Sequence, residues 1–168
     1  MGMRGKLVSA AVILAVIGFV GILFLGLDEK AATNPGDRAI DFELKDIHGK
    51  TYRLSDFKGR PVVLNFFATW CPPCIEEAPE LEAFGREYEG AQLLIIARGE
   101  SQKRMEKYIR ENHSQLIYLL DTKETVSEQY SVVGQPETLI INEDGIIVER
   151  FSGPTTKDYL ISLIEKRT

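Results

Sequence analysis

The residues whose types and spacing could do chemistry in this chain are Cys71 and Cys74, which are separated by two prolines and are its only cysteines. Two thiols at this spacing can pass reversibly between dithiol and disulfide, because a thiolate that attacks a disulfide is later displaced by its neighbour. A disulfide closing so small a loop would restrict the unfolded chain very little. The pair therefore predicts redox chemistry rather than stabilisation.

The elements on either side of the cysteines support this interpretation. Residues 62–67 (VVLNFF) are apolar on both alternating faces, as expected of a buried strand, and apolar residues recur at near-helical spacing from residue 75 onward. The pair thus lies at the start of a helix, where unpaired N–H groups and the helix dipole favour a thiolate. Cys71 comes first, on the exposed side of the turn, so we assign it the attack on a substrate sulfur and assign Cys74 the resolving step.

Two other interpretations of the pair are a static disulfide and half of a metal site. A structural metal site of this kind needs four thiolate or imidazole ligands. The only histidines are His48 and His113, which stand in unrelated contexts. We therefore expect neither a metal nor another cofactor.

The rest of the chain predicts an α/β domain with a mixed central sheet flanked by helices. A strand, a helix and a second strand in succession imply a parallel, right-handed crossover, while the last strands form a hairpin. Ser101 is expected to cap a helix, and a terminal helix is expected to bury Tyr159. The expected elements are an N-terminal hairpin at 42–54, strands at 62–67, 93–97 and 116–120, a short helix at 125–130, a hairpin around 142–145 and a helix at 155–166.

Residues 7–27 predict a membrane-spanning helix. They carry no charged side chain, and a span needs about 20 apolar residues, whereas the apolar region of a cleavable signal peptide runs for about 7–15. Arg4 and Lys6 precede the segment, so the positive-inside rule keeps the N-terminus in the cytoplasm. The expected organisation is a cytoplasmic stub (1–6), an uncleaved signal-anchor (7–27), a linker (28–34) and an extracytoplasmic domain (35–168). The expected location is the cell membrane, with a single pass.

The charge balance limits the class of partner. The formal net charge is −5, and Arg4 and Lys6 both precede the span, so the exported part is more acidic than the whole chain. An acidic domain is poorly suited to nucleic acid or to an anionic lipid surface. We expect no nucleic-acid partner.

Residues 65–74 (NFFATWCPPC), followed by Glu77 and Pro79, resemble thioredoxin-fold proteins. The segment is most similar to the membrane-anchored thiol-disulfide oxidoreductases of the TlpA/ResA-like, cytochrome c maturation type. Residues 133–138 (VGQPET) are similar to a second signature of that group. The resemblance runs from about residue 35 to the C-terminus and includes the N-terminal hairpin.

The resemblance implies roles for individual residues. Pro136 would be cis after Gln135 and would face Cys71, with Gln135 and Trp70 also contacting substrate. Glu77 would lie near the thiols and influence their protonation. Asn65 departs from ordinary thioredoxins, which carry a buried aspartate at this position, so Glu77 is expected to take over proton handling.

The resemblance also implies a function: reduction of disulfides in exported proteins, with apocytochrome c as a candidate substrate and a membrane electron donor of the CcdA/DsbD type. Two alternatives stay open. One is a disulfide-forming oxidant, and the other is a copper-binding or copper-delivery module of the same fold. A peroxidase is less well supported, because the chain has no distant resolving cysteine.

Overall fold

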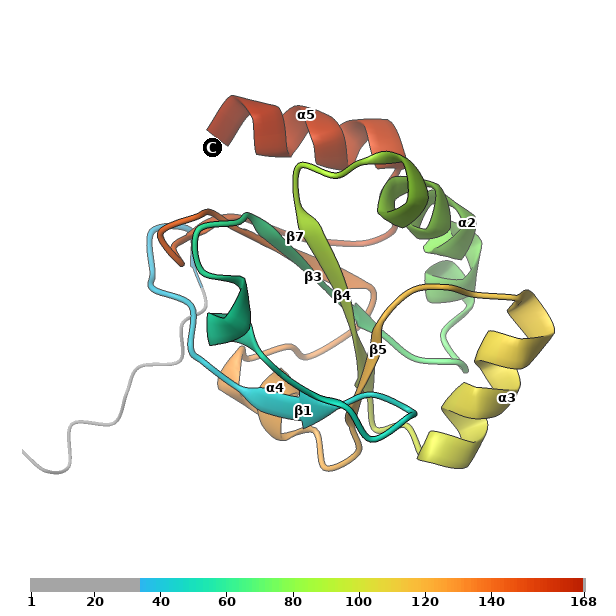
Figure 1. Ribbon diagram of the computed structural model, residues 1–168. Helices are drawn as coiled ribbons and strands as arrows, with labels where there is room; N and C mark the ends of the chain where they lie inside the picture. Colours follow the sequence, from blue (N-terminus) through green and yellow to red (C-terminus); the bar gives the residue numbers. More distant parts are fainter. Residues whose placement is uncertain (1–33, 168) are drawn as a thin grey trace, which may run out of the picture. The chain divides into compact units, whose positions relative to one another are not determined.

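The computed structural model of the chain describes residues 34–167 (Figure 1). The expected cytoplasmic stub, the signal-anchor at 7–27 and nearly all of the expected linker lie outside the described residues. Within residues 34–167, no helix has both the length and the apolar character needed to cross a membrane.

The core of the domain is a five-stranded mixed sheet with the strand order β5-β4-β3-β6-β7. The central strand β3 runs parallel to β4, and β4 runs parallel to β5, whereas β6 is antiparallel to β3 and β7 is antiparallel to β6. Every residue of β3 is buried. The strands are β3 (Val62–Phe67), β4 (Gln92–Arg98), β5 (Tyr118–Asp121), β6 (Glu137–Ile141) and β7 (Ile147–Ser152).

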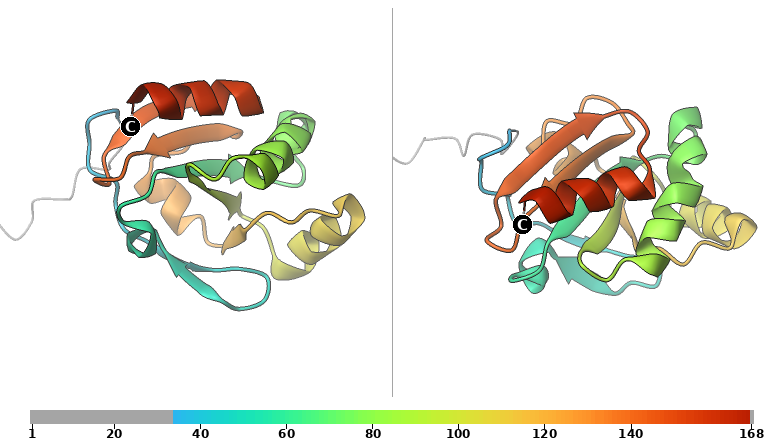
Figure 2. Two further views of the ribbon diagram at one scale, coloured as in Figure 1. Left: turned by 45° about the horizontal axis from the view of Figure 1, so that its top comes forward. Right: turned by 90° about the horizontal axis from the view of Figure 1, so that it is seen from above.

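Helices cover one face of this sheet, and a hairpin with a short helix covers the other (Figures 1 and 2). Side chains of α2, α3 and α5 share one apolar core with Val63 and Phe67 of β3. Leu64 and Phe66 point to the opposite face, where they pack with residues of the hairpin and α4. These elements are β1 (Glu43–Lys45), β2 (Thr51–Arg53), the 3-10 helix η1 (Leu54–Phe57), α2 (Pro72–Glu87), α3 (Gln102–Asn112), α4 (Thr125–Gln129) and α5 (Lys157–Arg167).

The strand register determines where the chemistry can be. Phe67 of β3 pairs with Ala97 of the parallel strand β4, so the two strands end side by side at the same edge of the sheet. The segments that follow them begin with the cysteine turn and with Gly99. Asn65 alternates with Val63 and Phe67, which places its side chain on the face of the sheet that α2 covers.

The elements predicted from the sequence are confirmed, with local differences. Ser101 caps α3 by accepting a hydrogen bond from the Arg104 backbone N–H at 3.4 Å, and the N-terminal hairpin and both halves of the final hairpin are present. The expected burial of Tyr159 is wrong: 49% of it is exposed. α5 turns Leu160, Leu163 and Ile164 toward the sheet, and Tyr159 lies beside that stripe with its ring against Phe151.

Candidate functional site: a disulfide at a helix N-terminus

Cys71 and Cys74 are joined by a disulfide at the start of α2, with their Cα atoms 5.3 Å apart. Cys71 is the N-cap residue of the helix, and its Sγ accepts a hydrogen bond from the Cys74 backbone N–H at 3.3 Å. Pro72 and Pro73 occupy the first helical positions, where a missing N–H costs nothing. The helix N-terminus therefore stabilises negative charge on the Cys71 sulfur.

The two sulfurs differ in access, but less than the sequence suggests. Cys71 is only 4% exposed in the disulfide form, and Cys74 is fully buried. Cys71 nevertheless borders an open groove, so it is the cysteine that an incoming sulfur can approach. The sequence predicts an exposed Cys71, and the structure exposes only the side of it that faces the groove.

The peptide bond between Gln135 and Pro136 is cis, as the resemblance implies. The Gln135 carbonyl oxygen lies 3.5 Å from the Sγ of Cys71, which brings the loop before β6 directly against the disulfide. In the dithiol form, the Cys71 thiol could donate a hydrogen bond to this carbonyl. Pro136 itself is buried and has no N–H to donate.

Glu77 is buried on the inner face of α2, whereas its neighbour Glu76 is exposed. Its Oε1 accepts a hydrogen bond from Asn65 Nδ2 at 2.9 Å, and its Oε2 accepts one from the Thr155 backbone N–H at 3.0 Å. Burial raises the pKa of Glu77 above its ordinary value, and the hydrogen bonds from Asn65 and Thr155 oppose that rise only in part. Glu77 is therefore a carboxyl that holds its proton more tightly than a surface acid does.

Asn65 connects this carboxyl to the strand that follows the cis-proline. Its Nδ2 also donates to Thr138 Oγ1 at 3.2 Å. Its Oδ1 is buried and has no hydrogen-bond partner among residues 34–167. The Asn65 amide thus lies between Glu77 and Thr138, and its Oδ1 is free to accept a hydrogen bond.

A groove of about 530 Å³ opens beside the disulfide. Trp70, which is expected to contact substrate, lines the groove beside Cys71, and 64% of the residue is accessible. Val133, before the cis-proline, is 94% exposed. The groove is lined by Trp70, Cys71, Pro72, Pro73, Arg98, Gly99, Glu124, Val133, Gly134 and Gln135.

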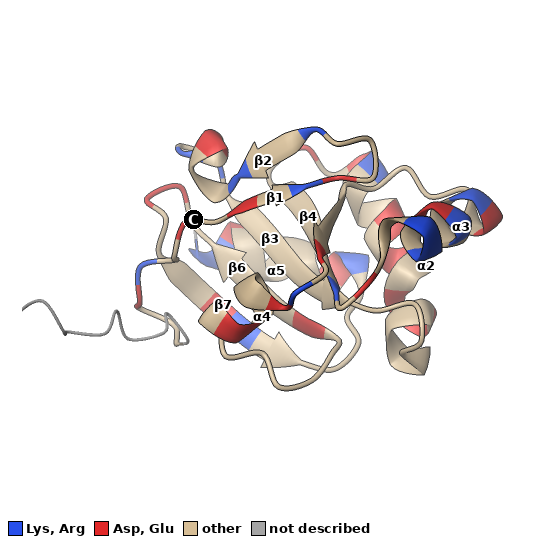
Figure 3. Ribbon diagram, turned by 90° about the horizontal axis from the view of Figure 1, so that it is seen from below, with Lys and Arg blue, Asp and Glu red and all other residues tan. Residues whose placement is uncertain are grey.

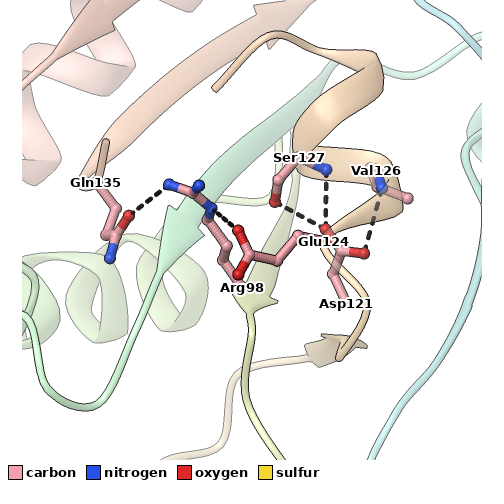
Figure 4. Close-up of polar contacts among 6 residues, drawn as sticks. All are labelled: Arg98, Asp121, Glu124, Val126, Ser127 and Gln135. Atoms are coloured by element: carbon pink, nitrogen blue, oxygen red, sulfur yellow. Dashed lines mark hydrogen bonds and ion pairs between the residues drawn. The ribbon is translucent and has the colours of Figure 1, made fainter. Parts of the chain in front are cut away.

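Arg98 and Glu124 are groove residues that the sequence analysis missed. Arg98 Nε donates to Glu124 Oε2 at 2.8 Å, and its Nη1 donates to the side-chain Oε1 of Gln135 at 3.0 Å (Figure 4). The position of Arg98 was a usable signal, because it directly follows the apolar run 93–97. The ends of adjacent parallel strands meet at one edge of a sheet, so an arginine there lies near the cysteine turn.

Glu100 supports the turn that precedes the cysteines and was also missed. It is fully buried, and its Oε1 accepts hydrogen bonds from the backbone N–H and the hydroxyl of Thr69 at 2.8 and 2.7 Å. Arg104 pairs with its other oxygen at 3.3 Å. This buried, paired carboxylate fixes the backbone that presents Trp70 and Cys71.

The fold and the site together define a thioredoxin-like protein: a mixed sheet carries a Cys-Pro-Pro-Cys turn at a helix N-terminus, opposite a cis-proline. Residues 35–150 match the model of the AhpC/TSA family, and the chain belongs to that family. Within it, the TlpA/ResA-like resemblance is confirmed by named relatives.

Over 160 residues, the chain is 31% identical to the thioredoxin-like protein YneN of Bacillus subtilis, covering 92% of this chain and 94% of that protein. Over 149 residues, it is 34% identical to the thiol-disulfide oxidoreductase ResA of Geobacillus kaustophilus, covering 88% and 85%. The crystal structure of StoA from Bacillus subtilis superimposes with a TM-score of 0.68 at 27% identity, covering 77% of this chain and 98% of StoA. The protein is a thiol-disulfide oxidoreductase.

Proposed function

We propose that this thiol-disulfide oxidoreductase is anchored in the cell membrane and reduces disulfides in exported proteins, with apocytochrome c as a candidate substrate. The observation that carries the proposal is the placement of the Cys71 sulfur. It lies at a helix N-terminus, 3.5 Å from the Gln135 carbonyl, and borders an open groove. An extended polypeptide bearing a disulfide can lie in such a groove with its sulfur in line with Cys71.

The chemistry is two successive exchanges. The Cys71 thiolate attacks one sulfur of the substrate disulfide, forms a mixed disulfide and releases the other substrate sulfur as a thiolate, which takes up a proton. The Cys74 thiolate then attacks the Cys71 sulfur, closes the internal disulfide and releases the second substrate thiol. Two electrons pass to the substrate, and the protein ends in the disulfide form seen in the structure.

Glu77 is the proton-handling residue in this proposal. Its raised pKa lets it keep a proton where a surface carboxyl has already lost it. The Nδ2 of Asn65 donates to the Glu77 carboxylate. A rotation of the Asn65 amide by 180° would instead present the unpartnered Oδ1, which can accept a hydrogen bond from the protonated carboxyl. Asn65 can therefore hydrogen-bond to Glu77 in both of its charge states. Asn65 cannot carry the proton itself, which leaves that role to Glu77.

The direction of electron flow is proposed from the chain as a whole. Residues 7–27 would place the domain outside the cytoplasm, where disulfides form and persist. A reductant there needs a supply of electrons, and we propose a membrane dithiol protein of the CcdA/DsbD type that re-reduces Cys71–Cys74. In the copper-delivery alternative a histidine would have to act with the cysteines, but His48 lies in the β1–β2 turn and His113 at the end of α3, and neither lines the groove.

Trapping with a Cys74→Ser variant tests the proposal. Without Cys74 the mixed disulfide through Cys71 cannot resolve, so we expect covalent adducts with exported proteins in intact cells. The matched control is the double variant Cys71→Ser/Cys74→Ser, which should yield none. Adducts with cytoplasmic proteins alone would contradict the topology, and the absence of adducts would contradict the redox role.

A further inference from the structure

We propose that Arg98 and the side chain of Gln135 form a carboxylate-binding site in the groove, which selects disulfide substrates that carry an acidic residue close to the attacked cysteine. The inference rests on the proposed function, in which the groove receives a polypeptide disulfide. Beyond that function, the inference specifies that the substrate residue near the disulfide is acidic.

Arg98 has hydrogen-bonding capacity that its protein neighbours do not use. Glu124 takes only the Nε–H of the guanidinium, and Gln135 takes one N–H of Nη1. Nη2 has no hydrogen-bond partner within residues 34–167. Arg98 is 21% exposed and lines the groove, so its free donors are accessible. A guanidinium edge with donors on both Nη atoms matches a carboxylate in bidentate fashion.

The side chain of Gln135 is oriented so that it adds a donor to the groove. Because its Oε1 accepts from Arg98, the other amide atom, Nε2, is turned away from the guanidinium, and it has no partner among the described residues. Gln135 is half-buried and lines the same groove. Arg98 and Gln135 together thus present N–H donors to whatever occupies the groove. The positive charge of the Arg98 guanidinium favours an anionic acceptor there, and the Gln135 amide adds a further donor.

Arg98 and Gln135 lie close to the reacting sulfur of Cys71. The Gln135 carbonyl lies 3.5 Å from Cys71 Sγ, and the side chain of the same residue contacts Arg98. A substrate carboxylate bound there belongs to a residue only a few positions from the attacked cysteine. The walls on either side are exposed apolar side chains, Trp70 and Val133, which suit the stem of such a residue.

Glu124 fixes the Arg98 guanidinium through Nε and leaves the edge formed by the two Nη atoms unoccupied. It makes a one-point contact at Nε and is 41% exposed, so water weakens its neutralising effect. Its backbone has a φ of 58°, a left-handed conformation disfavoured for residues with a Cβ. A strained residue kept in contact with a groove residue is typical of a functional position.

The test uses the full-length, reduced protein in detergent and peptides with one cystine, in which a single flanking residue is Glu, Gln or Lys. The readout is the second-order rate constant of thiol-disulfide exchange. We expect the Glu peptide to react about tenfold faster than the Gln peptide at low salt, as a charge-assisted contact predicts, with the Lys peptide slowest. Scanning the Glu through the flanking positions locates the contact.

Variants at position 98 test whether Arg98 is the source of the preference for the Glu peptide. Arg98→Met should reduce the Glu-to-Gln rate ratio to between about one and two, and Arg98→Lys should leave it at about threefold, because the charge stays but the fork is lost. Arg110→Met removes an exposed arginine of α3 outside the groove and should keep the wild-type ratio. Equal rates for the Glu and Gln peptides, or an Arg98→Met ratio like wild type, would overturn this inference alone. No reaction with any peptide would overturn the proposed function and this inference with it.

Discussion

At the scale of single residues, the hydrogen bonds to the Glu77 carboxylate come from two neutral donors. Asn65 Nδ2 and the Thr155 backbone N–H each bind one oxygen, and the residue is 2% exposed. Neutral donors offset only part of the cost of burying a charge, which is why the pKa of Glu77 is raised. The structure thus keeps a protonatable carboxyl group on the buried face of α2, the helix that begins at the disulfide.

Replacing Glu77 by Gln should slow disulfide exchange by roughly a hundredfold, the range of a lost general acid–base group. The substitution keeps the size of the side chain and removes the proton. The pH profile of kcat/KM should lose the limb that titrates above 4.5, the ordinary value for this group. Glu76→Gln changes the exposed neighbour and should leave rate and profile as in wild type. Wild-type kinetics and an unchanged Cys71 titration in Glu77→Gln would exclude the assigned role.

The same group should make the stability of the disulfide form depend on pH. The folded pKa of Glu77 lies above the unfolded value, so its contribution to the free energy of unfolding is complete below pH 4.5 and is lost as pH rises through the folded pKa. Denaturant unfolding of wild type and Glu77→Gln between pH 4 and 8 measures this contribution. The wild type should lose stability relative to the variant as pH rises, and a relative gain would contradict the burial argument.

At the scale of elements, the cysteine turn could be predicted because its determinants are local. Strand β3 is apolar on both faces, the prolines suit a helix start, and the cysteine spacing is unusual in itself. The contacts of Arg98, Glu100 and Asn65 could not be predicted in the same way. Each joins residues more than ten positions apart, and only the packing of the folded chain brings them together.

The error at Tyr159 has a similar origin. Spacing along a helix identifies an apolar stripe, but the edge of that stripe is set by where the helix lies on the sheet. Tyr159 is at this edge and finds Phe151 as its partner, with their ring centroids 5.5 Å apart.

Helix α4 is short, and its start depends on one buried carboxylate. Asp121 accepts hydrogen bonds from the Val126 N–H at 3.2 Å and from the Ser127 N–H and hydroxyl at 2.8 and 2.7 Å (Figure 4). Asp121→Ala should lower the free energy of unfolding by about 2 kcal/mol, because these buried donors lose their acceptor. Urea denaturation measures the loss.

Two further variants serve as comparisons for the stability loss expected in Asp121→Ala. Asp121→Asn retains one acceptor oxygen and should cost about 1 kcal/mol. Glu111→Ala removes an exposed α3 carboxylate whose one ion-pair contact among residues 34–167 is with Lys107 at 3.9 Å, and it should change stability by less than about 0.5 kcal/mol. A loss in Asp121→Ala no larger than that in Glu111→Ala would contradict the capping role.

At the scale of the whole molecule, charge and sheet topology are compatible with the proposed polypeptide substrate. Lys and Arg are interspersed with Glu along α3 (Figure 3), and the chain carries a net charge of −5. The groove lies where the strand ends of β3 and β4 meet the cis-proline loop, and with Glu124 before α4 four separate segments shape it. Such a groove suits an extended chain with a disulfide better than a nucleic acid.

We propose that Cys71 and Cys74 form a dithiol that donates electrons to exported proteins. The equilibrium reduction potential of this pair, measured against defined ratios of oxidised and reduced glutathione or dithiothreitol, tests it most directly. We predict a value close to about −270 mV, in the range of reducing thioredoxins. A value close to about −120 mV, typical of a strong disulfide-forming oxidant, would contradict the account.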